Sequence, residues 1–134
     1  MFSQKRQLNE LPREEALRRL ASVPIGRIVF TIGGLPTIWP VVHVLDDDDV
    51  VVRTQLEATT FATDGAVVAY EADVIDLETR TGWSTSIAGV ASVVEDPAEL
   101  ERFEDLIKPM SDQPVTYVIR IKTDEVRGYE VVEE

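Results

Sequence analysis

Hydrophobic and polar residues alternate along most of this chain, which is the pattern of half-buried β-strands. Gly33-Gly34 separates two such segments and predicts a two-residue hairpin turn, because paired glycines adopt positive φ without strain. Pro36 and Pro40 cannot donate to a sheet ladder, so the second strand is expected at an edge, or bulged or bent near Pro40. The pattern predicts strands at 25–32, 35–45, 49–54, 66–72, 83–95, 115–122 and 125–132.

Helical spacing appears in only a few short segments. Residues 12–21 carry apolar side chains at helical intervals after an early proline, which predicts a short amphipathic helix. The run Asp96-Pro97-Ala98-Glu99 is a capping box that begins a second helix, expected to reach about Lys108. Residues 56–63 are expected to form a helical turn or two, and 73–82 a polar turn. Antiparallel strands without regular strand–helix alternation indicate a closed or partly closed barrel.

Size and composition limit what this domain can do. At 134 residues we expect one domain spanning 1–134, with residues 1–10 and 133–134 loose. Thirteen basic residues against 25 acidic ones give a net charge of -12, which disfavours nucleic acid and anionic membranes as partners. The absence of cysteine excludes disulfides, thiolate nucleophiles and cysteine-ligated metals. No signal peptide or membrane-spanning run is found, so a cytoplasmic protein is expected.

The acidic residues and the one histidine offer little catalytic chemistry. His43 would have to serve any Ser-His-Asp triad or zinc site, and we interpret it as a partly buried packing residue. The run 46–49 lacks the glycine and distal glutamate of a calcium loop, and is interpreted as a solvated turn. Asp73, Asp76 and Glu78 are interpreted as solubilising loop residues rather than an acid–base pair.

Two residue pairs have a stronger chemical signal. Arg53 and Thr54 lie at a strand end and suit a phosphate through bidentate and single hydrogen bonds, with ion pairing to an acidic surface as the alternative. Trp83 and Ser84 could stack on and hydrogen-bond a planar ligand, with a core or interface role as the alternative.

Several segments, taken in order, resemble the pyridoxamine 5′-phosphate oxidase-like flavin-binding family over about residues 11–122. The small apolar strand 87–91, the helix capped by Asp96 and the strand 118–121 also fit that order. The segments that carry the resemblance are Ile25-Gly26-Arg27-Ile28-Val29-Phe30, Trp39-Pro40-Val41, Val50-Val51-Val52-Arg53-Thr54, Val67-Val68-Ala69-Tyr70-Glu71-Ala72-Asp73 and Thr81-Gly82-Trp83-Ser84.

The resemblance implies a split β-barrel that forms a homodimer and binds FMN, or in relatives a deazaflavin or haem, in grooves between subunits. By position it implies that Arg53 and Thr54 hold the cofactor phosphate, with Thr59 and Thr60 following where the family places a lysine. The strand Pro40-Val41-Val42 would lie against the flavin ring. Trp83 and Ser84 would come from the neighbouring subunit.

Two functional hypotheses follow from the residues and the resemblance together. The first is an FMN-type flavoprotein that acts as an oxidoreductase, in which the cofactor carries the hydride chemistry and no side chain need act as acid or base. The second is a non-catalytic split-barrel dimer that has lost its cofactor and serves as a binding or interaction module. Thr59-Thr60 in place of the lysine, and Val42 in place of the family's asparagine, motivate the second.

Overall fold

A computed structural model describes residues 5–55, 66–112 and 116–134 of the chain. Eight strands and two short helices are found in these ranges, so the expected mainly β class is confirmed. The helices are α1 (Arg13–Ala21) and α2 (Pro97–Leu106). The strands are β1 (Arg6–Leu11), β2 (Ile25–Ile32), β3 (Leu35–Asp46), β4 (Asp49–Thr54), β5 (Val67–Asp76), β6 (Thr81–Val93), β7 (Tyr117–Ile121) and β8 (Glu125–Glu133).

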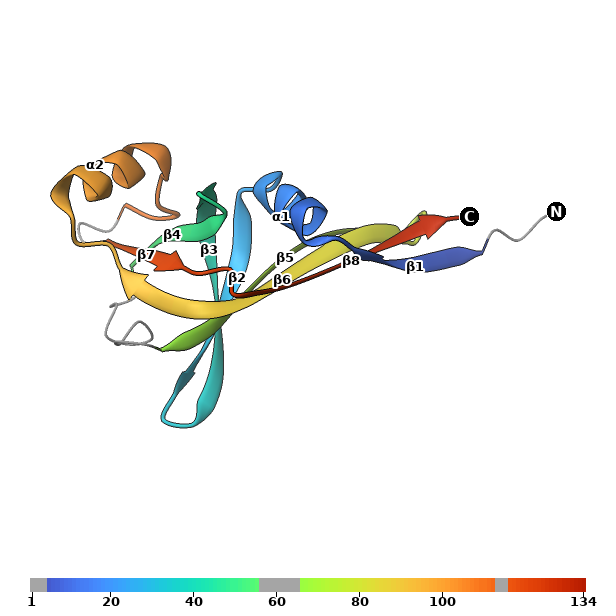
Figure 1. The fold of residues 1–134 in the computed structure, drawn as a ribbon, viewed down its shortest axis with the longest axis horizontal. Helices are drawn as coiled ribbons and strands as arrows, with labels where there is room; N and C mark the ends of the chain where they lie inside the picture. Colours follow the sequence, from blue (N-terminus) through green and yellow to red (C-terminus); the bar gives the residue numbers. More distant parts are fainter. Residues whose placement is uncertain (1–4, 56–65, 113–115) are drawn as a thin grey trace.

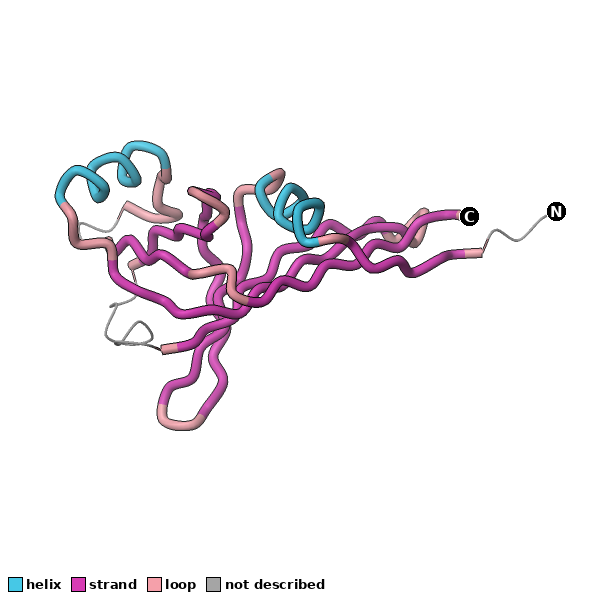
Figure 2. Tube along the Cα trace, in the orientation of Figure 1, coloured by secondary structure: helices cyan, strands magenta, loops and turns pink. Residues whose placement is uncertain are grey.

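All strand pairs are antiparallel, and the long strand β6 divides the sheet into a barrel and an arm. The strand order is β1-β8-β6-β5-β2-β3-β4-β7, and β7 pairs back onto β6. The second half of β6, Ala91–Val93, makes this closing contact, whereas Gly82–Ala88 pairs with β8. The strands from β6 round to β7 therefore form a closed ring, and β8 and β1 extend from it as an arm that carries both termini (Figures 1 and 2).

Two apolar clusters hold these parts together. The inner face of the barrel is buried against α1, whose Leu17 and Leu20 pack with Ile28, Tyr70 and Ile87. A smaller cluster lies beneath α2 and contains Val51, Phe103, Ile107 and Val118. Both helices lie above the sheet in Figure 1, so neither covers the outer face of the arm.

The prolines of β3 lie where the sequence expected an edge. Within the described part of the chain, residues 35–41 of β3 pair with β2 alone, and β4 joins only from Val42 onwards. The His43 N–H donates to the carbonyl of Pro24 at 2.9 Å, so odd-numbered N–H groups of β3 point toward β2. Pro36 and Pro40 therefore occupy positions that face the open edge, where a missing donor leaves the hairpin ladder intact and blocks a further strand.

His43 is a buried structural residue, as expected. Its Nε2 atom lies 2.8 Å from the Leu20 carbonyl and must donate to it, which leaves Nδ1 to accept from the Tyr70 hydroxyl at 2.5 Å. The two rings meet edge to face with centroids 5.2 Å apart. This network ties the end of α1 to β3 and β5. Burial lowers the pKa of His43 and raises that of Tyr70, so both side chains are neutral.

Several local expectations differ from the structure. We expected residues 1–10 to be loose, but Arg6–Leu11 forms β1 and pairs along its whole length with β8. The expected polar turn at 73–82 is shorter, because β5 continues to Asp76 and β6 begins at Thr81. Helix α2 ends at Leu106 rather than at Lys108. The helical turns expected at 56–63 lie outside the described residues.

The aspartate run is only partly a solvated turn. Asp47 and Asp48 form the turn with positive φ. Asp46 accepts from Arg102 at 3.0 Å and from Arg120 at 2.8 Å, and Asp49 lies 3.3 Å from Arg120. These contacts hold the pKa of Asp46 below its ordinary value, since both guanidinium groups favour its charged form. The arginines are 56 and 74 positions away from Asp46 in the sequence, so no short-range sequence pattern predicts these ion pairs.

Candidate functional site

The structure brings two of the expected site segments together on adjacent strands. Val42 of β3 is paired directly with Arg53 of β4, so Pro40–Val42 and Arg53–Thr54 lie side by side. Their exposure differs, because Pro40 is exposed and Val42 half-buried, whereas Val41 and Thr54 are buried. A ligand on these strands would therefore meet Pro40, Val42 and Arg53. The candidates Thr59 and Thr60 lie outside the described residues.

Arg53 already serves as a cap for the C-terminal end of α2. Its Nη1 atom donates to the carbonyls of Glu104 and Ile107, each at 2.9 Å, and its Nε donates to the hydroxyl of Thr116 at 3.0 Å. These bonds use three of the five N–H donors of the guanidinium. A cation at this end of a helix is favourable because the unpaired carbonyls carry partial negative charge.

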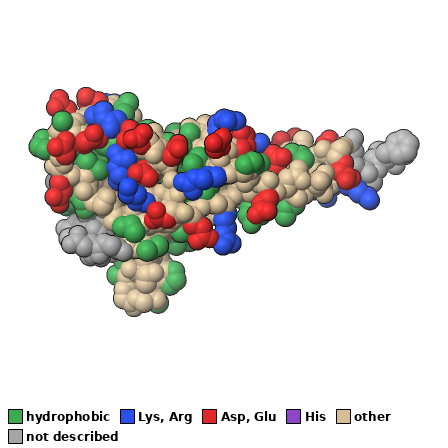
Figure 3. Space-filling view, viewed as in Figure 1, with side chains coloured by type: hydrophobic (Ala, Val, Ile, Leu, Met, Phe, Trp, Pro, Cys, Tyr) green, Lys and Arg blue, Asp and Glu red, His purple; other side chains and the backbone are tan. Residues whose placement is uncertain are grey.

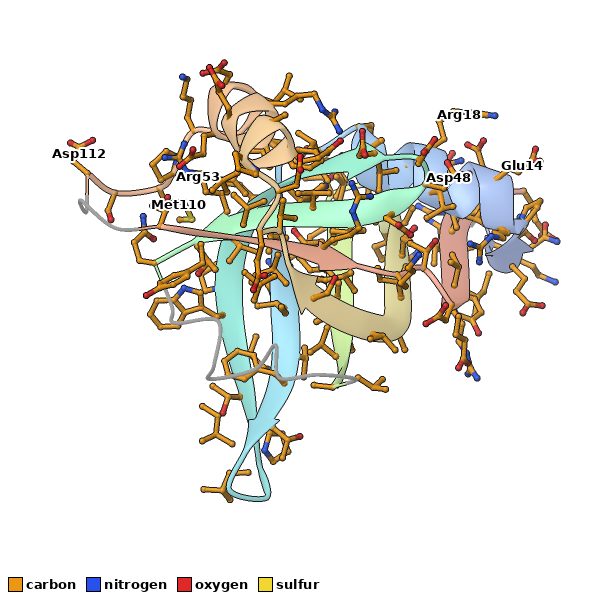
Figure 4. All side chains as sticks on the ribbon, turned by 60° about the vertical axis from the view of Figure 1, so that its left-hand side comes forward. Glu14, Arg18, Asp48, Arg53, Met110 and Asp112 are labelled. Carbon is orange, nitrogen blue, oxygen red and sulfur yellow. The ribbon has the colours of Figure 1, made fainter. Side chains whose placement is uncertain are left out.

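Among the contacts of the described residues, one nitrogen of Arg53 makes no hydrogen bond and remains for a ligand. Nη2 lies 3.9 Å from a carboxylate oxygen of Glu104, which is a loose ion pair. The Arg53 side chain is only 16% exposed, and Figure 4 shows it below the end of α2 near Met110. A phosphate here would meet the two Nη2 hydrogens and would compete with the Glu104 carboxylate for them.

A groove of about 290 Å³ lies at the far end of the molecule, on the outer face of the arm. Its floor follows one cross-strand row, in which Leu8, Val131, Gly82 and Ile75 face each other across four strands. Leu8 and Ile75 are 67% and 64% exposed, so this is an uncovered apolar surface. The groove is lined by Leu8, Ile75, Leu77, Arg80, Thr81, Gly82, Trp83, Ser84, Tyr129 and Val131.

Trp83 and Ser84 both line this groove, but from opposite sides of β6, because successive strand residues point to opposite faces. Ser84 lies on the outer face opposite Tyr129. The Trp83 ring is half-buried and packs against the barrel core. Ser84 is therefore the member of the pair that faces a ligand on the outer surface.

The Arg53 segment and the groove are far apart within one chain. The β7 partner of Arg53 is Val118, whose carbonyl accepts from the Val94 N–H at 2.9 Å. Val94 is eleven positions after Trp83, which is about 36 Å of extended strand. A single chain therefore does not bring the two halves of the expected site into contact.

A charged cluster lies beside the groove, and it includes Asp73, which was expected to be a solubilising loop residue but belongs to β5. Arg27 of β2 contacts Glu71 of β5 at 2.9 Å and Asp73 at 3.8 Å. Glu71 and Asp73 share the outer face of β5, and Asp73 is paired with Ser84. Burial, with the neighbouring Asp73 carboxylate, raises the pKa of Glu71 to about 7. Only the pairing of β2 with β5 brings Arg27 to these carboxylates, and residues 73–82 were expected to form a turn.

Other parts of the described chain offer no comparable site. A second hollow of about 520 Å³ lies between α1 and the β3–β4 turn, with Glu14, Arg18 and Asp48 around it (Figure 4). Its charges are mixed, and Arg18 is already paired with Glu15. No group of three or more metal-ligating side chains occurs among residues 5–55, 66–112 and 116–134. In the same ranges, no helix has the length and apolar character needed to cross a membrane.

Comparison with known proteins places this architecture in a family. The family model described as pyridoxamine 5′-phosphate oxidase matches residues 12–131. An uncharacterized protein of Mycobacterium tuberculosis is 42% identical over 133 residues, covering 95% of this chain and 88% of the relative.

Two solved structures extend the comparison to the fold. A Corynebacterium glutamicum protein assigned to pyridoxamine 5′-phosphate oxidases has a TM-score of 0.80 and 28% identity, covering 92% of this chain and 98% of that one. An FAD-binding protein of Mycobacterium smegmatis has a TM-score of 0.70 and 27% identity, with the same coverage. The fold is thus the split β-barrel of these structures, and the chain belongs to the pyridoxamine 5′-phosphate oxidase-like family.

Proposed function

We propose that this protein is a flavin-binding homodimer whose cofactor lies between subunits, with FMN as the flavin and oxidoreduction as the activity. The observation that carries the proposal is the separation of Arg53 from the groove at Trp83 and Ser84. A partner turned about a twofold axis can place its groove beside the Arg53 segment of the first chain. Each of the two sites would then take one half from each subunit.

The groove is well suited to the planar ring of a flavin. The Arg53 segment is less well suited to the phosphate of a flavin. Leu8, Ile75 and Tyr129 supply apolar walls, and Ser84 supplies a hydroxyl beside them. On the other half, Arg53 would bind the phosphate through Nη2, with Pro40 and Val42 against the ring. In a bound complex the flavin supplies the hydride or electron transfer, and these residues bind it, orient it and exclude water.

The relatives support a flavin without selecting which one. The Mycobacterium smegmatis protein, at 27% identity, binds FAD. A second protein of that organism binds FAD and haem, and at 15% identity it shares the fold alone. FMN is the smaller ligand and would need only the one phosphate contact at Arg53. FAD, a deazaflavin and haem are therefore the alternatives that the experiment must include.

Spectroscopy of the purified protein tests this proposal. If the protein is purified with its cofactor, we expect a visible flavin absorbance band, and we expect the flavin to be released on unfolding. If the purified protein is colourless, we expect it to quench the fluorescence of FMN on titration. Ser84→Ala should weaken binding about two- to tenfold, the value of one neutral hydrogen bond. Ser92→Ala is the control, because Ser92 is an exposed serine of the same strand that does not line the groove. A colourless protein whose melting temperature does not change with FMN, FAD, deazaflavin or haem would refute the proposal.

One observation favours a second function, a split-barrel dimer that no longer binds a cofactor and acts as an interaction module. Three of the five Arg53 donors are used to hold α2, and Glu104 competes for the rest. The net charge of -12 further disfavours a phosphate. Stable dimers that fail every cofactor titration would favour this function over the first.

A further inference from the structure

Among the described residues, the outer face of the sheet has an exposed apolar region at each end and charges between them. Ile38, Val67 and Val90 lie at the barrel end and Leu8 and Ile75 at the arm end, and all are exposed. They belong to one face because the cross-strand rows connect them through Val29, Ala69 and Ala88. Figure 3 shows acidic and basic side chains over the body and the arm, and none at the tip of the β2–β3 hairpin.

Arg27, Glu71 and Asp73 form the charged centre of this face. Arg27 and Glu71 lie in one cross-strand row with Ser86 and Arg127, and Asp73 lies in the next row with Ser84 and Tyr129. The Glu71 and Asp73 side chains are 33% and 28% exposed. They are thus partly desolvated already and lie where a second copy would cover them.

The other charges on this face come from β8 and β1. Arg127 is paired with Glu125 at 2.6 Å, so that pair is neutral by itself. Glu10 lies on the outer face of β1 in the row of Asp73. The neighbours of Glu71 and Asp73 on β6 are the uncharged Ser86 and Ser84. The unbalanced charge at the centre of the face is therefore the second carboxylate of the Glu71–Asp73 pair.

A second copy of the chain fits this face because the cluster carries both positive and negative charge. In a twofold contact, Arg27 of each copy can face the carboxylates of the other, which is the self-complementarity that an isologous interface needs. The open edge of β3 is blocked by Pro36 and Pro40, so the face rather than that edge is the available surface.

Resting on the proposed homodimer, we propose that this cluster is the centre of the dimer contact, and that a proton on the Glu71–Asp73 pair makes the dimer tighter in mild acid than in mild base. With one proton the cluster has one guanidinium and one carboxylate, and is neutral. Without that proton each copy brings one uncompensated negative charge into the contact, where low dielectric strengthens the repulsion. The raised pKa of Glu71, about 7, sets the pH at which this change occurs.

Sedimentation measurements of the dimer dissociation constant at two pH values test this inference. Between about pH 6 and about pH 8 we expect the dimer dissociation constant to rise at least about tenfold. It should rise about a hundredfold if both copies must be protonated for the dimer to form. Glu71→Gln fixes the neutral state and should dimerise equally well at both pH values. Asp73→Asn removes the carboxylate pair and should do the same. Glu10→Gln, on the same face but outside the pair, should keep the pH dependence.

The outcomes separate this inference from the proposed function. A dimer whose dissociation constant is the same at both pH values overturns the inference and leaves the flavin-binding dimer intact. Wild-type pH dependence retained in both Glu71→Gln and Asp73→Asn also overturns it. A chain that stays monomeric at micromolar concentrations under all conditions overturns both, and a far-ultraviolet spectrum of each variant confirms that it is folded.

Discussion

Tyr70→Phe removes a single hydroxyl from the centre of the barrel and leaves the ring in place. In the native protein that hydroxyl lies 2.5 Å from His43 Nδ1, and His43 Nε2 donates to the Leu20 carbonyl. Both side chains are fully or almost fully buried. The substitution therefore leaves Nδ1 as a buried acceptor without a donor, in a space too closely packed for an easy replacement.

The expected cost follows from the unsatisfied acceptor rather than from lost packing. A buried polar group without a partner costs about 1 to 3 kcal/mol. For a domain of this size, that corresponds to a decrease in melting temperature of roughly 3 to 15 °C. His43→Phe should cost more, because the buried Tyr70 hydroxyl loses the acceptor for its proton and the Leu20 carbonyl loses its bond from Nε2. The two substitutions together should cost less than the sum of each alone, since they remove the same hydrogen bond.

The pH dependence gives a sharper test than the magnitude. The pKa of His43 in the folded protein is below its ordinary value of 6.5, so the fold favours the neutral ring. Its contribution to stability is complete above about pH 6.5 and is lost as the pH falls through the lowered pKa. Tyr70→Phe removes a bond that favours the neutral ring, so it should raise this pKa and reduce the acid sensitivity.

Urea unfolding at several pH values measures both effects. The difference in unfolding free energy between wild type and Tyr70→Phe should be largest near neutral pH and should narrow below it. Tyr117→Phe is a control, because Tyr117 is another strand tyrosine that is only half-buried. Equal stability of wild type and Tyr70→Phe, or a difference that stays constant from neutral to acid pH, would show that the assignment of donor and acceptor is wrong.

Two further substitutions test how the edge and the helix end are built. Pro36→Thr restores an N–H at the open edge of β3, so we expect this variant to aggregate and to scatter more light at high protein concentration. Thr37→Val, whose N–H faces β2, should scatter like wild type. Equal scattering of the two variants would contradict the edge assignment. Arg53→Gln removes the cap of α2 and should cost about 1.5 to 3 kcal/mol in urea unfolding, whereas the exposed Arg127→Gln should cost little; equal costs would contradict the capping role.

Short-range signals predicted much of the fold. Gly33 and Gly34 both have positive φ, and the flanking strands pair in the register that a two-residue turn requires. Asp96 caps α2 by accepting from the Glu99 N–H at 3.0 Å, as the capping box predicts. The burial of His43 also followed from its place among apolar residues of one strand face. Each of these depends on residues that are close together in the sequence.

What the sequence could not show depends on contacts between distant strands. The strand β1 has the sequence Arg-Gln-Leu-Asn-Glu-Leu, whose apolar residues do not alternate, and it is ordered by pairing with β8 more than a hundred positions later. Arg27 reaches Glu71 only because β2 pairs with β5. The resemblance implied that Arg53 and the strand Pro40-Val41-Val42 line one cofactor site, and the structure pairs Arg53 with Val42. No local signal indicated that the Arg53 guanidinium holds α2.

The capping role of Arg53 changes what its presence implies about a cofactor. An arginine that caps a helix will be retained for stability whether or not a phosphate binds beside it, so Arg53 alone does not indicate a working phosphate site. A substitution of Arg53 would destabilise α2 and lower the affinity for any ligand at the same time. Loss of binding in such a variant would therefore not show that Arg53 contacts the ligand. The groove differs, because Leu8 and Ile75 are exposed and support no part of the core. Such apolar surface costs solubility unless something covers it, so the stronger structural argument for a bound partner or cofactor comes from the groove and the face around it.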